Sequence, residues 1–385
     1  MSRINDLIAE YCPNGVEYRE LAELVDYQQP SPYIVSSTNY DDSFSLPVLT
    51  AGQSFILGYS DDDQGIFYAS AERPVIIFDD FTTSFHWVDF DFKVKSSAIK
   101  MLRIKPDVDC SFRYVYYAMS CIQYVPKEHS RQWISIYSTF KIPVPPLPVQ
   151  EEIVRILDSF SSLEAELEAE LEARRKQYTH YRDELLKFER ERVLIASLGE
   201  LCKISVGRKN GTAGEFGEYP YVNAGTSMSG FVNEWSEEGD CVTTPSRGQG
   251  GMGFVAYQAS RFWCGPLCYV MRSKHSDVMI KYVYYYLCSH KADILGLVHE
   301  GGTPAINKSE LAGLRILVPP FEEQRRIVSI LDRFDKLTND LSSGLPAEIE
   351  ARRKQYEYYR DRLLSFDELA DNARILAHFR IPALT

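Results

Sequence analysis

Two stretches of the chain carry apolar side chains at intervals of three and four residues. The first runs from Ile153 to Phe188, and the second runs from Ile327 to Phe366. These intervals place the apolar side chains on one narrow stripe of a helix, which is the pattern of a coiled coil. A helix cannot bury such a stripe alone, so we expect the two helices to pair in an antiparallel arrangement. Gly344 and Pro346 predict a kink or a restart in the second helix.

Proline pairs stand before both stretches. They occur in VPPLP (144–148) and in LVPPF (317–321), and two glutamates follow each of them. Proline suits the start of a helix, and carboxylates are favourable beside the free N–H groups of the first turn. We therefore expect both helices to begin at these prolines, with the glutamates in the first turn. The glutamates are Glu151, Glu152, Glu322 and Glu323.

The remaining segments have a different pattern. Residues 1–148 and 193–320 contain short apolar runs, such as PVIIFDD (74–80), that are separated by turn-forming residues. Such runs predict short strands. Two tyrosine-rich stretches, at 114–121 and 282–289, predict short helices among these strands.

The chain also repeats itself. Residues 172–188, EARRKQYTHYRDELLKF, match residues 350–366, EARRKQYEYYRDRLLSF, at 13 of 17 positions. A weaker match pairs PVLTAGQS (47–54) with PYVNAGTS (220–227). Self-similarity over so long a period indicates that the two halves of the chain share one architecture.

These patterns predict an α+β fold class. We expect two similar globular domains of mixed α/β character, separated by two long antiparallel coiled-coil-like helices, with a pseudo-twofold internal repeat. The predicted parts are a first globular segment at 1–148, a first helical segment at 149–192, a second globular segment at 193–320, and a second helical segment with a C-terminal tail at 321–385.

Composition agrees with a soluble chain of two or three domains. The 385 residues are 45% hydrophobic and 25% charged, without an apolar run long enough to span a membrane. The first residues lack the basic and then apolar order of a secretory leader, so we expect a cytoplasmic protein. The formal net charge is −12. A protein that binds nucleic acid by itself usually carries a basic surface instead.

Few residues suggest catalysis or metal binding. Eight cysteines are scattered along the chain, and the nearest pair, Cys264 and Cys268, stands in an apolar strand-like run. Reduced, buried thiols are therefore expected in place of a metal site. The seven histidines are dispersed and form no recognisable arrangement with a nucleophile. The sequence predicts no metal, no cofactor and no catalysis by this chain.

Two near matches to catalytic motifs have structural alternatives. VPPF (318–321) is similar to the NPPF signature of amino-methyltransferases, but Val318 stands where an Asn or Asp would bind the amine. GTPAINKS (302–309) nearly matches a phosphate-binding loop, with Asn307 in place of the last glycine. That loop should follow a strand, whereas a helix is expected here. Helix-start geometry and an ordinary loop are the preferred interpretations.

Four segments resemble a known family. They are PVPPLPVQEEIVRILD (143–158), LVPPFEEQRRIVSILD (317–332), LPAEIEARRKQYEYYRDRLLSF (345–366) and TTPSRGQGG (243–251). They are similar to segments of the DNA-specificity subunit of type I restriction-modification enzymes, and the resemblance covers essentially the whole chain. It implies that each globular domain recognises one half of a bipartite double-stranded DNA target, and that the helices set the distance between the halves.

The resemblance also implies partners for the repeated block. Two copies of an adenine-N6 methyltransferase subunit would dock on the helices, and separate motor-nuclease restriction subunits would cut the DNA. Two identical partners need two similar docking surfaces, whereas the alternative is an ordinary solvated helix face. The candidate docking residues are Arg174, Arg175, Lys176, Tyr178, Arg352, Arg353, Lys354 and Tyr356.

Candidate DNA contacts are polar or basic side chains on glycine-rich loops, because such loops can enter a groove and pair with base edges. In the second globular segment they are Asn223, Ser227, Ser246, Arg247, Gln249, Thr303 and Lys308. The repeat aligns EGGTPAI (300–306) with EHSRQWI (128–134) and places DDFTTSFHW (79–87) near TTPSRG (243–248). This alignment adds Thr82, Thr83, Ser84, His86, Arg131 and Gln132. The alternative for each residue is a turn-forming or buried structural role.

Because the composition is acidic, binding of DNA would require partner subunits to supply positive charge. Two further hypotheses therefore remain. The main alternative is an interaction scaffold with two recognition lobes and no nucleic acid, and the other is a self-contained methyltransferase, which lacks the expected motifs. The helical segments are alike, whereas the globular segments have diverged. This difference favours two lobes that recognise different targets.

Overall fold

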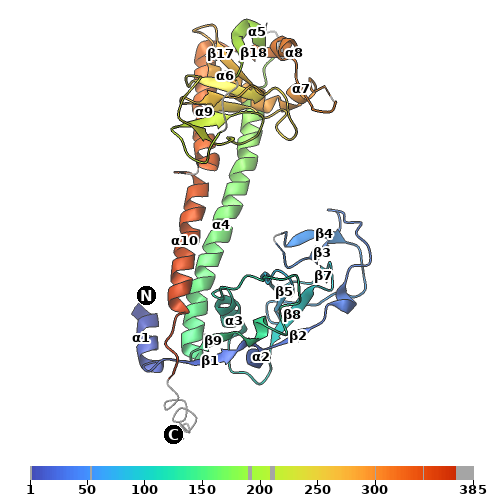
Figure 1. Ribbon diagram of the computed structural model, residues 1–385, viewed down its shortest axis with the longest axis vertical. Helices are drawn as coiled ribbons and strands as arrows, with labels where there is room; N and C mark the ends of the chain where they lie inside the picture. Colours follow the sequence, from blue (N-terminus) through green and yellow to red (C-terminus); the bar gives the residue numbers. More distant parts are fainter. Residues whose placement is uncertain are drawn as a thin grey trace. The chain divides into compact units, whose positions relative to one another are not determined.

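The computed structural model of the chain describes residues 2–52, 54–189, 193–208, 213–299, 301–340 and 342–369. The chain forms two compact units (Figure 1). Unit 1 comprises Met1–Ala165 and Ala351–Thr385, and unit 2 comprises Glu166–Glu350. Each unit therefore combines one globular segment with parts of both helical segments. The C-terminal tail beyond residue 369 lies outside the described residues.

Unit 1 contains a four-stranded sheet in the order β2-β8-β5-β6, a three-stranded sheet in the order β4-β3-β7, and the pair β1-β9. Neighbouring strands are antiparallel except β3 and β7, which are parallel. The elements are α1 (Ser2–Tyr11), β1 (Glu17–Glu20), α2 (Leu21–Leu24), β2 (Val25–Gln28), the 3-10 helix η1 (Ser31–Tyr33), β3 (Leu46–Leu49), β4 (Ile56–Ser60), β5 (Val75–Asp79), β6 (Phe85–Val88), β7 (Lys93–Val94), β8 (Ile99–Ile104), α3 (Phe112–Met119), the 3-10 helix η2 (Tyr137–Thr139), β9 (Lys141–Val144) and the first part of α4 (Leu147–Leu185).

Unit 2 repeats this topology with sheets in the orders β11-β17-β14-β15, β13-β12-β16 and β10-β18. Again one pair is parallel, β12 with β16. The elements are β10 (Leu194–Ser197), α5 (Leu198–Leu201), β11 (Cys202–Val206), β12 (Tyr219–Val222), β13 (Phe231–Val232), β14 (Cys241–Pro245), β15 (Ala256–Gln258), β16 (Trp263–Cys264), β17 (Cys268–Ser273), α6 (Ile280–Ser289), α7 (Lys291–Leu295), α8 (Lys308–Gly313), β18 (Arg315–Val318), α9 (Phe321–Asn339) and α10 (Leu345–Leu363), whose last part belongs to unit 1.

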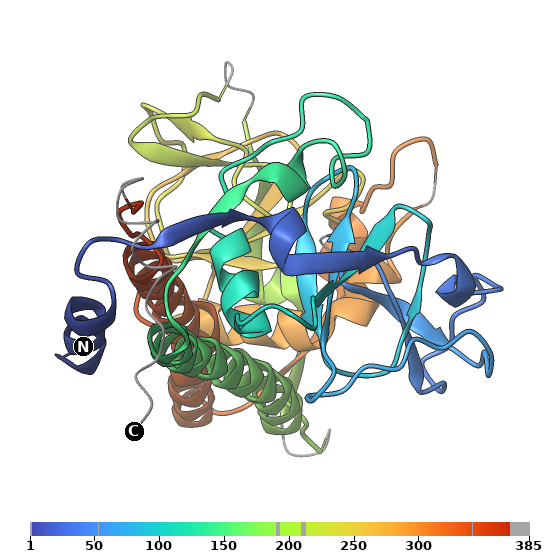
Figure 2. The ribbon, with the colours of Figure 1, turned by 90° about the horizontal axis from the view of Figure 1, so that it is seen from below.

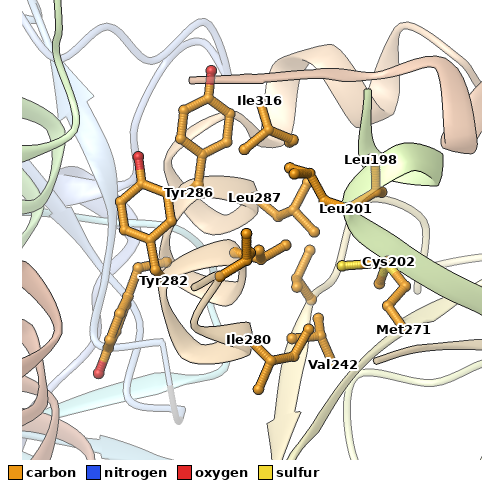
Figure 3. Packing of buried hydrophobic residues seen from close by; sticks show 14 of the residues in the cluster. Leu198, Leu201, Cys202, Val242, Met271, Ile280, Tyr282, Tyr286, Leu287 and Ile316 are labelled. Carbon is orange, nitrogen blue, oxygen red and sulfur yellow. The ribbon is translucent and has the colours of Figure 1, made fainter. Parts of the chain in front are cut away.

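The main core of each unit lies between its four-stranded sheet and the helix formed by a tyrosine-rich stretch. In unit 2, Val242 on β14 and Met271 on β17 are register partners and are fully buried with residues of α6 (Figure 3). In unit 1, Ile76 and Leu102 are the corresponding register partners, buried with residues of α3. Both predicted short helices are therefore confirmed, as α3 and α6.

Hydrogen bonds of buried side chains attach each core, in the same way in both units, to the start of a long helix and to the strand that precedes it. The Tyr114 hydroxyl donates to the Pro143 carbonyl at 2.9 Å, and the Tyr282 hydroxyl donates to the Leu317 carbonyl at 2.5 Å. The Gln150 and Gln324 side chains, each almost completely buried, accept the backbone N–H of Ser111 and of Met279. These repeated bonds fix the start of each long helix against its globular segment.

The long helices begin at the proline pairs as predicted, at Leu147 for α4 and at Phe321 for α9. Glu322 and Glu323 lie in the first turn of α9. The expectation for Glu151 and Glu152 was wrong, because α4 already contains Leu147–Gln150 before them and its first turn holds no acidic residue. Pro148 is tolerated there because a residue of the first turn needs no intrahelical N–H bond.

The second helix is interrupted, as Gly344 and Pro346 predicted. Helix α9 ends at Asn339 and α10 begins at Leu345. Gly344 is buried against the end of α9, where a Cβ atom would lie 2.5 Å from the Lys336 carbonyl oxygen. Any larger residue would push the two helices apart at this point.

The helical stripes pair within each unit. In unit 1, α4 and α10 lie side by side in both ribbon views (Figures 1 and 2). The Phe160 and Tyr359 rings stack with centroids 5.5 Å apart, and Arg353 forms an ion pair with Glu164 at 2.8 Å. In unit 2, the Tyr181 ring on α4 lies 5.6 Å from Phe334 on α9. No helix among the described residues is long and apolar enough to cross a membrane.

Candidate nucleic-acid interface

Three loops converge beyond the end of β14 in unit 2. They are the described residues 223–230, 246–254, and 299 with 301–307, which we name the A, B and C loops of unit 2. Arg247 of the B loop forms an antiparallel bridge with Ala305 of the C loop, and the Gly248 N–H donates to the Pro304 carbonyl at 3.0 Å. The backbones of these two loops are therefore paired.

Glycines let the A loop approach the B loop. A Cβ atom on Gly251 would lie 1.9 Å from the Ala224 carbonyl oxygen, which no side chain could tolerate. Gly248 has a φ of +135°, a backbone conformation that residues other than glycine rarely adopt. A Cβ atom added to Gly248 would lie 3.1 Å from the Cβ atom of Ala224. Gly248 and Gly251 of the SRGQGG sequence are thus required by close contact between the A and B loops.

The same three loops converge in unit 1. The A loop (50–52 and 54–55), the B loop (79–84) and the C loop (128–134) surround the end of β5. The Ser84 hydroxyl donates to the Ala51 carbonyl at 2.5 Å, which joins the A and B loops. The Gln132 N–H donates to the Asp80 carbonyl at 2.8 Å, which joins the B and C loops.

Equivalent hydrogen bonds align the two sets of loops. The Asp80 N–H donates to Ala98, as the Ser246 N–H donates to Leu267. The Asp80 carbonyl then accepts from Gln132, as the Ser246 carbonyl accepts from Ile306. Gln132 therefore corresponds to Ile306, and the alignment of EHSRQWI with EGGTPAI was wrong by two residues. The sequence alignment paired identical residue types, whereas the backbone hydrogen bonds define which positions are structurally equivalent.

The structure separates the sequence candidates into two groups. One group is exposed on the loops or at the start of α8: Thr82, Arg131, Ser227, Arg247, Gln249, Thr303 and Lys308. The other group is partly or fully buried and forms contacts within or between loops: Thr83, Ser84, His86, Gln132, Asn223 and Ser246. The second group fits the turn-forming or structural alternative.

Two of the buried side chains illustrate that role. Asn223 accepts the Leu267 N–H at 2.9 Å and so ties the A loop to the turn before β17. Gln132 is 1% exposed; its amide donates to the Ser130 carbonyl at 2.7 Å and its oxygen accepts from Tyr124 at 2.7 Å. Gln132 therefore shapes the C loop from inside, whereas its neighbour Arg131 is exposed.

Arg247 is the exposed cation on the paired loops of unit 2. Its guanidinium makes no hydrogen bond or ion pair with any described residue, so it is free to bind a ligand. Burial raises the pKa of the Tyr269 phenol, and the charge of the nearby Arg247 opposes that shift. Arg247 thus lies at the surface directly beside the buried end of β17.

Sequence reasoning missed three residues of this region. Asp80 and Lys100 are fully buried and form an ion pair at 3.3 Å. His129 is exposed and stacks on Phe81 with ring centroids 4.5 Å apart. A lone lysine inside the apolar run AIKMLRI was the available signal for the buried pair, whereas nothing in the sequence indicated the stacking.

The repeated blocks, residues 172–188 and 350–366, have both a structural face and a solvent face. Tyr178 and Tyr356 are half-buried, and each packs against a hydrophobic core. The first block lies in unit 2, where Asp183 accepts a hydrogen bond from Ser289. The second lies almost entirely in unit 1, where Asp361 accepts a weaker bond from Cys121. Each block is thus attached to the globular segment of the other half of the sequence.

The solvent face of the blocks is charged. Lys176 donates to Glu172 and lowers the pKa of that carboxylate, and Arg174 pairs with Glu170 at 2.7 Å. Arg353 on α10 forms an ion pair with Glu164 on α4, whereas Arg175 forms no ion pair with a described residue. The two blocks therefore present similar, though not identical, cationic surfaces.

A family model for the type I restriction modification DNA specificity domain matches residues 13–173 and again residues 192–351. The chain belongs to this family. The resemblance inferred from the helix starts and the repeated block is confirmed, and the two matches correspond to the internal repeat.

Curated members of the specificity family match at length. The type I restriction enzyme EcoR124I/EcoR124II specificity subunit of Escherichia coli is 40% identical over 393 residues, covering 91% of this chain and 94% of that protein. The putative type I specificity subunit S.MpnORF615P of Mycoplasma pneumoniae is 33% identical over 257 residues, covering 63% of this chain and 99% of that protein.

Solved structures agree on the fold. The crystal structure of a type I restriction-modification S subunit from M. genitalium covers 91% of this chain and 96% of its own, with a TM-score of 0.65 at 16% identity. The predicted α+β class with two repeated domains and long helices is therefore confirmed for this member of the specificity family.

Proposed function

We propose that this chain is the DNA-specificity subunit of a type I restriction-modification complex, and that the three-loop surface of each unit recognises one half of a bipartite duplex target. One observation carries the proposal: the loop frame occurs twice, held by equivalent backbone bonds, while the exposed side chains differ. Arg131 stands on the C loop of unit 1, and Arg247 and Gln249 stand on the B loop of unit 2. Such side chains can pair with base edges in the major groove.

The long helices set the spacing between the half-sites in this proposal. Helix α4 is continuous over 39 residues and contributes to both units. A continuous helix transmits a change in its length, because each residue adds about 1.5 Å. The loop surfaces themselves contain no residue of α4, so spacing and half-site sequence should be separable by mutation.

The repeated blocks dock two copies of an adenine-N6 methyltransferase subunit in this proposal. The observation that supports this docking role is that the exposed charged residues are repeated in both blocks, together with the buried residues. Burial and attachment would explain Tyr178 and Asp183, but they do not require Lys176 and its counterpart Lys354, both of which are exposed. Motor-nuclease restriction subunits join the same complex when DNA is cut.

This chain contributes recognition and no chemistry of its own. With a net charge of −12, the isolated subunit should bind DNA weakly, because phosphate neutralisation dominates non-specific affinity. Partner subunits supply most of the positive surface, while the loops supply contacts to bases. The complex acts on DNA in the cytoplasm.

The test is coexpression of the chain with an adenine methyltransferase subunit of a type I system that it binds, followed by sequencing of methylated adenines in the host genome. The proposal predicts one bipartite motif with a fixed gap, and no methylation by either subunit alone. A stable complex that methylates no defined motif would favour the scaffold hypothesis instead.

A further inference from the structure

A buried ion pair lies beneath the loops of unit 1. Lys100 on β8 and Asp80 in the B loop are both 0% exposed, with the ammonium 3.3 Å from the Asp80 Oδ2 atom. The same ammonium donates to the Gln29 side chain at 3.1 Å. Removing two charges from water is costly, and a buried pair is seldom the most stable solution for a core. Its presence calls for an explanation other than stability.

Asp80 connects this pair to the C loop. Its carbonyl accepts the Gln132 N–H at 2.8 Å, and its Oδ1 atom accepts the Trp133 N–H at 2.8 Å. Its Oδ2 atom has no hydrogen-bond partner and lies 4.0 Å from the guanidinium of Arg131, a side chain that is 52% exposed. Three successive residues of the C loop are therefore arranged around one aspartate, Gln132 at its backbone carbonyl and Arg131 and Trp133 at its carboxylate.

In unit 2, neutral groups hold the C loop at the position that is equivalent to Gln132 of unit 1. The strand register makes Tyr269 the counterpart of Lys100, because Phe78 faces Lys100 as Thr244 faces Tyr269. The Tyr269 hydroxyl donates to the Ile306 carbonyl at 2.9 Å in a buried bond. Ile306 is the counterpart of Gln132. The same loop position is thus held by an ion pair in one unit and by a phenol in the other.

We propose that the Asp80–Lys100 pair is the positioning device for the C loop of unit 1, which holds Arg131 toward the first half-site, and that Tyr269 positions the C loop of unit 2. This inference rests on the proposed function. The Asp80 carboxylate is held by Lys100 and attracts the Arg131 guanidinium across 4.0 Å, a separation too long for a hydrogen bond. A loop that is ordered before binding loses less entropy when it meets DNA.

Three variants of the full chain, each in complex with the methyltransferase subunit, test the proposal. Asp80→Ala/Lys100→Met removes the device without leaving an unpaired buried charge. Asp80→Ser/Lys100→Tyr installs the arrangement of unit 2, with a hydroxyl that can reach the Gln132 carbonyl. Tyr269→Phe removes the device of unit 2. Competition binding compares duplexes with single base changes in either half-site.

Asp80→Ala/Lys100→Met should reduce discrimination at the first half-site by roughly 5- to 150-fold, the value of one good base contact, and leave the second half-site unchanged. Tyr269→Phe should reduce discrimination at the second half-site and leave the first half-site unchanged. Asp80→Ser/Lys100→Tyr should restore discrimination at the first half-site. In hydrogen exchange, the Trp133 amide should lose protection in the first variant.

Retained discrimination at the first half-site in the first variant would overturn the inference, as would an equal loss at both half-sites, which a general folding defect produces. Unchanged protection of the Trp133 amide would also overturn it. Failure of the wild-type complex to discriminate any bipartite target would instead refute the proposed function, so the two failures are distinguishable.

Discussion

Tyr117 donates a hydrogen bond of 2.5 Å to the carboxylate of Asp158. The relationship recurs in unit 2, where Tyr285 donates to Asp332 at 2.5 Å. A cation completes each set, Arg113 in unit 1 and Lys281 in unit 2. The aspartates end the ILD sequence of the long helices, so this motif is explained by attachment of α3 to α4 and of α6 to α9.

Tyr117→Phe should therefore lower the free energy of unfolding by about 1.5 kcal/mol, the lower end for a hydrogen bond to a charged group, since Asp158 is partly exposed. Urea unfolding measures the change. Tyr116→Phe is the control, because that ring packs against the same core without a hydroxyl bond to a described residue. Equal effects of the two variants would mean that the bond contributes nothing.

Arg247→Ala should weaken recognition of one half-site by about 1–3 kcal/mol and leave the other half-site and the fold unchanged. The Arg247 guanidinium is exposed on the B loop. Arg261→Ala is the control, because the Arg261 guanidinium forms an ion pair with Glu238 and lies over the Trp235 ring. Binding to duplexes with each base changed in turn measures the effect. A uniform loss for every sequence would make Arg247 a phosphate contact.

Charge reversal of the repeated blocks should remove methyltransferase copies one at a time. Arg174→Glu/Arg175→Glu should release one copy and Arg352→Glu/Arg353→Glu the other, as native mass measurement would detect. Because Arg353 also pairs with Glu164 on α4, a second version with Glu164→Arg keeps that ion pair. Two bound copies in every variant would confine the blocks to a structural role.

Acid should weaken unit 1 through Asp62. Hydrogen bonds from Ser36, helped by Lys93, lower the pKa of Asp62 to about 2 from its usual 3.8. A depressed folded-state pKa stabilises the protein above the unfolded value, and that stabilisation disappears as the pH falls from about 4 toward 2. The difference in unfolding free energy between wild type and Asp62→Asn should thus shrink over this range.

Asp61→Asn is the control for that measurement, because the exposed Asp61 carboxylate has no bond to a described residue. A difference between wild type and Asp62→Asn that stays constant from pH 6 to pH 2 would contradict the assignment.

Local patterns predicted most of the architecture. The helical stripes, the proline starts, the restart at Gly344 and the helices α3 and α6 all depend on neighbours within a few residues, which a sequence displays directly. The repeat added the topology of one unit to that of the other. The position of Glu151 was missed because helix starts can shift by a turn when a proline is tolerated inside the first turn.

The site depended on contacts between distant strands. The alignment of the C loops was wrong because only backbone bonds to Asp80 and Ser246 define it, and no letter pattern encodes them. The ion pair joins Asp80 of the B loop to Lys100 on β8, so neither residue alone predicted burial. Exposed candidates such as Arg247 were recognisable because a glycine-rich loop with one arginine is a local signal.

The central claim is that each unit recognises its own half-site while the helices set the gap. The most direct measurement is the motif of methylated adenines in cells that carry a deletion of residues 166–169, which removes about one turn, or 6 Å, from α4 and keeps the apolar stripe nearly in phase. Duplex DNA advances about 3.4 Å per base pair. The account predicts the same two half-site sequences with a gap shorter by about one or two base pairs and reduced activity. An unchanged gap with full activity, or altered half-site sequences, would contradict it.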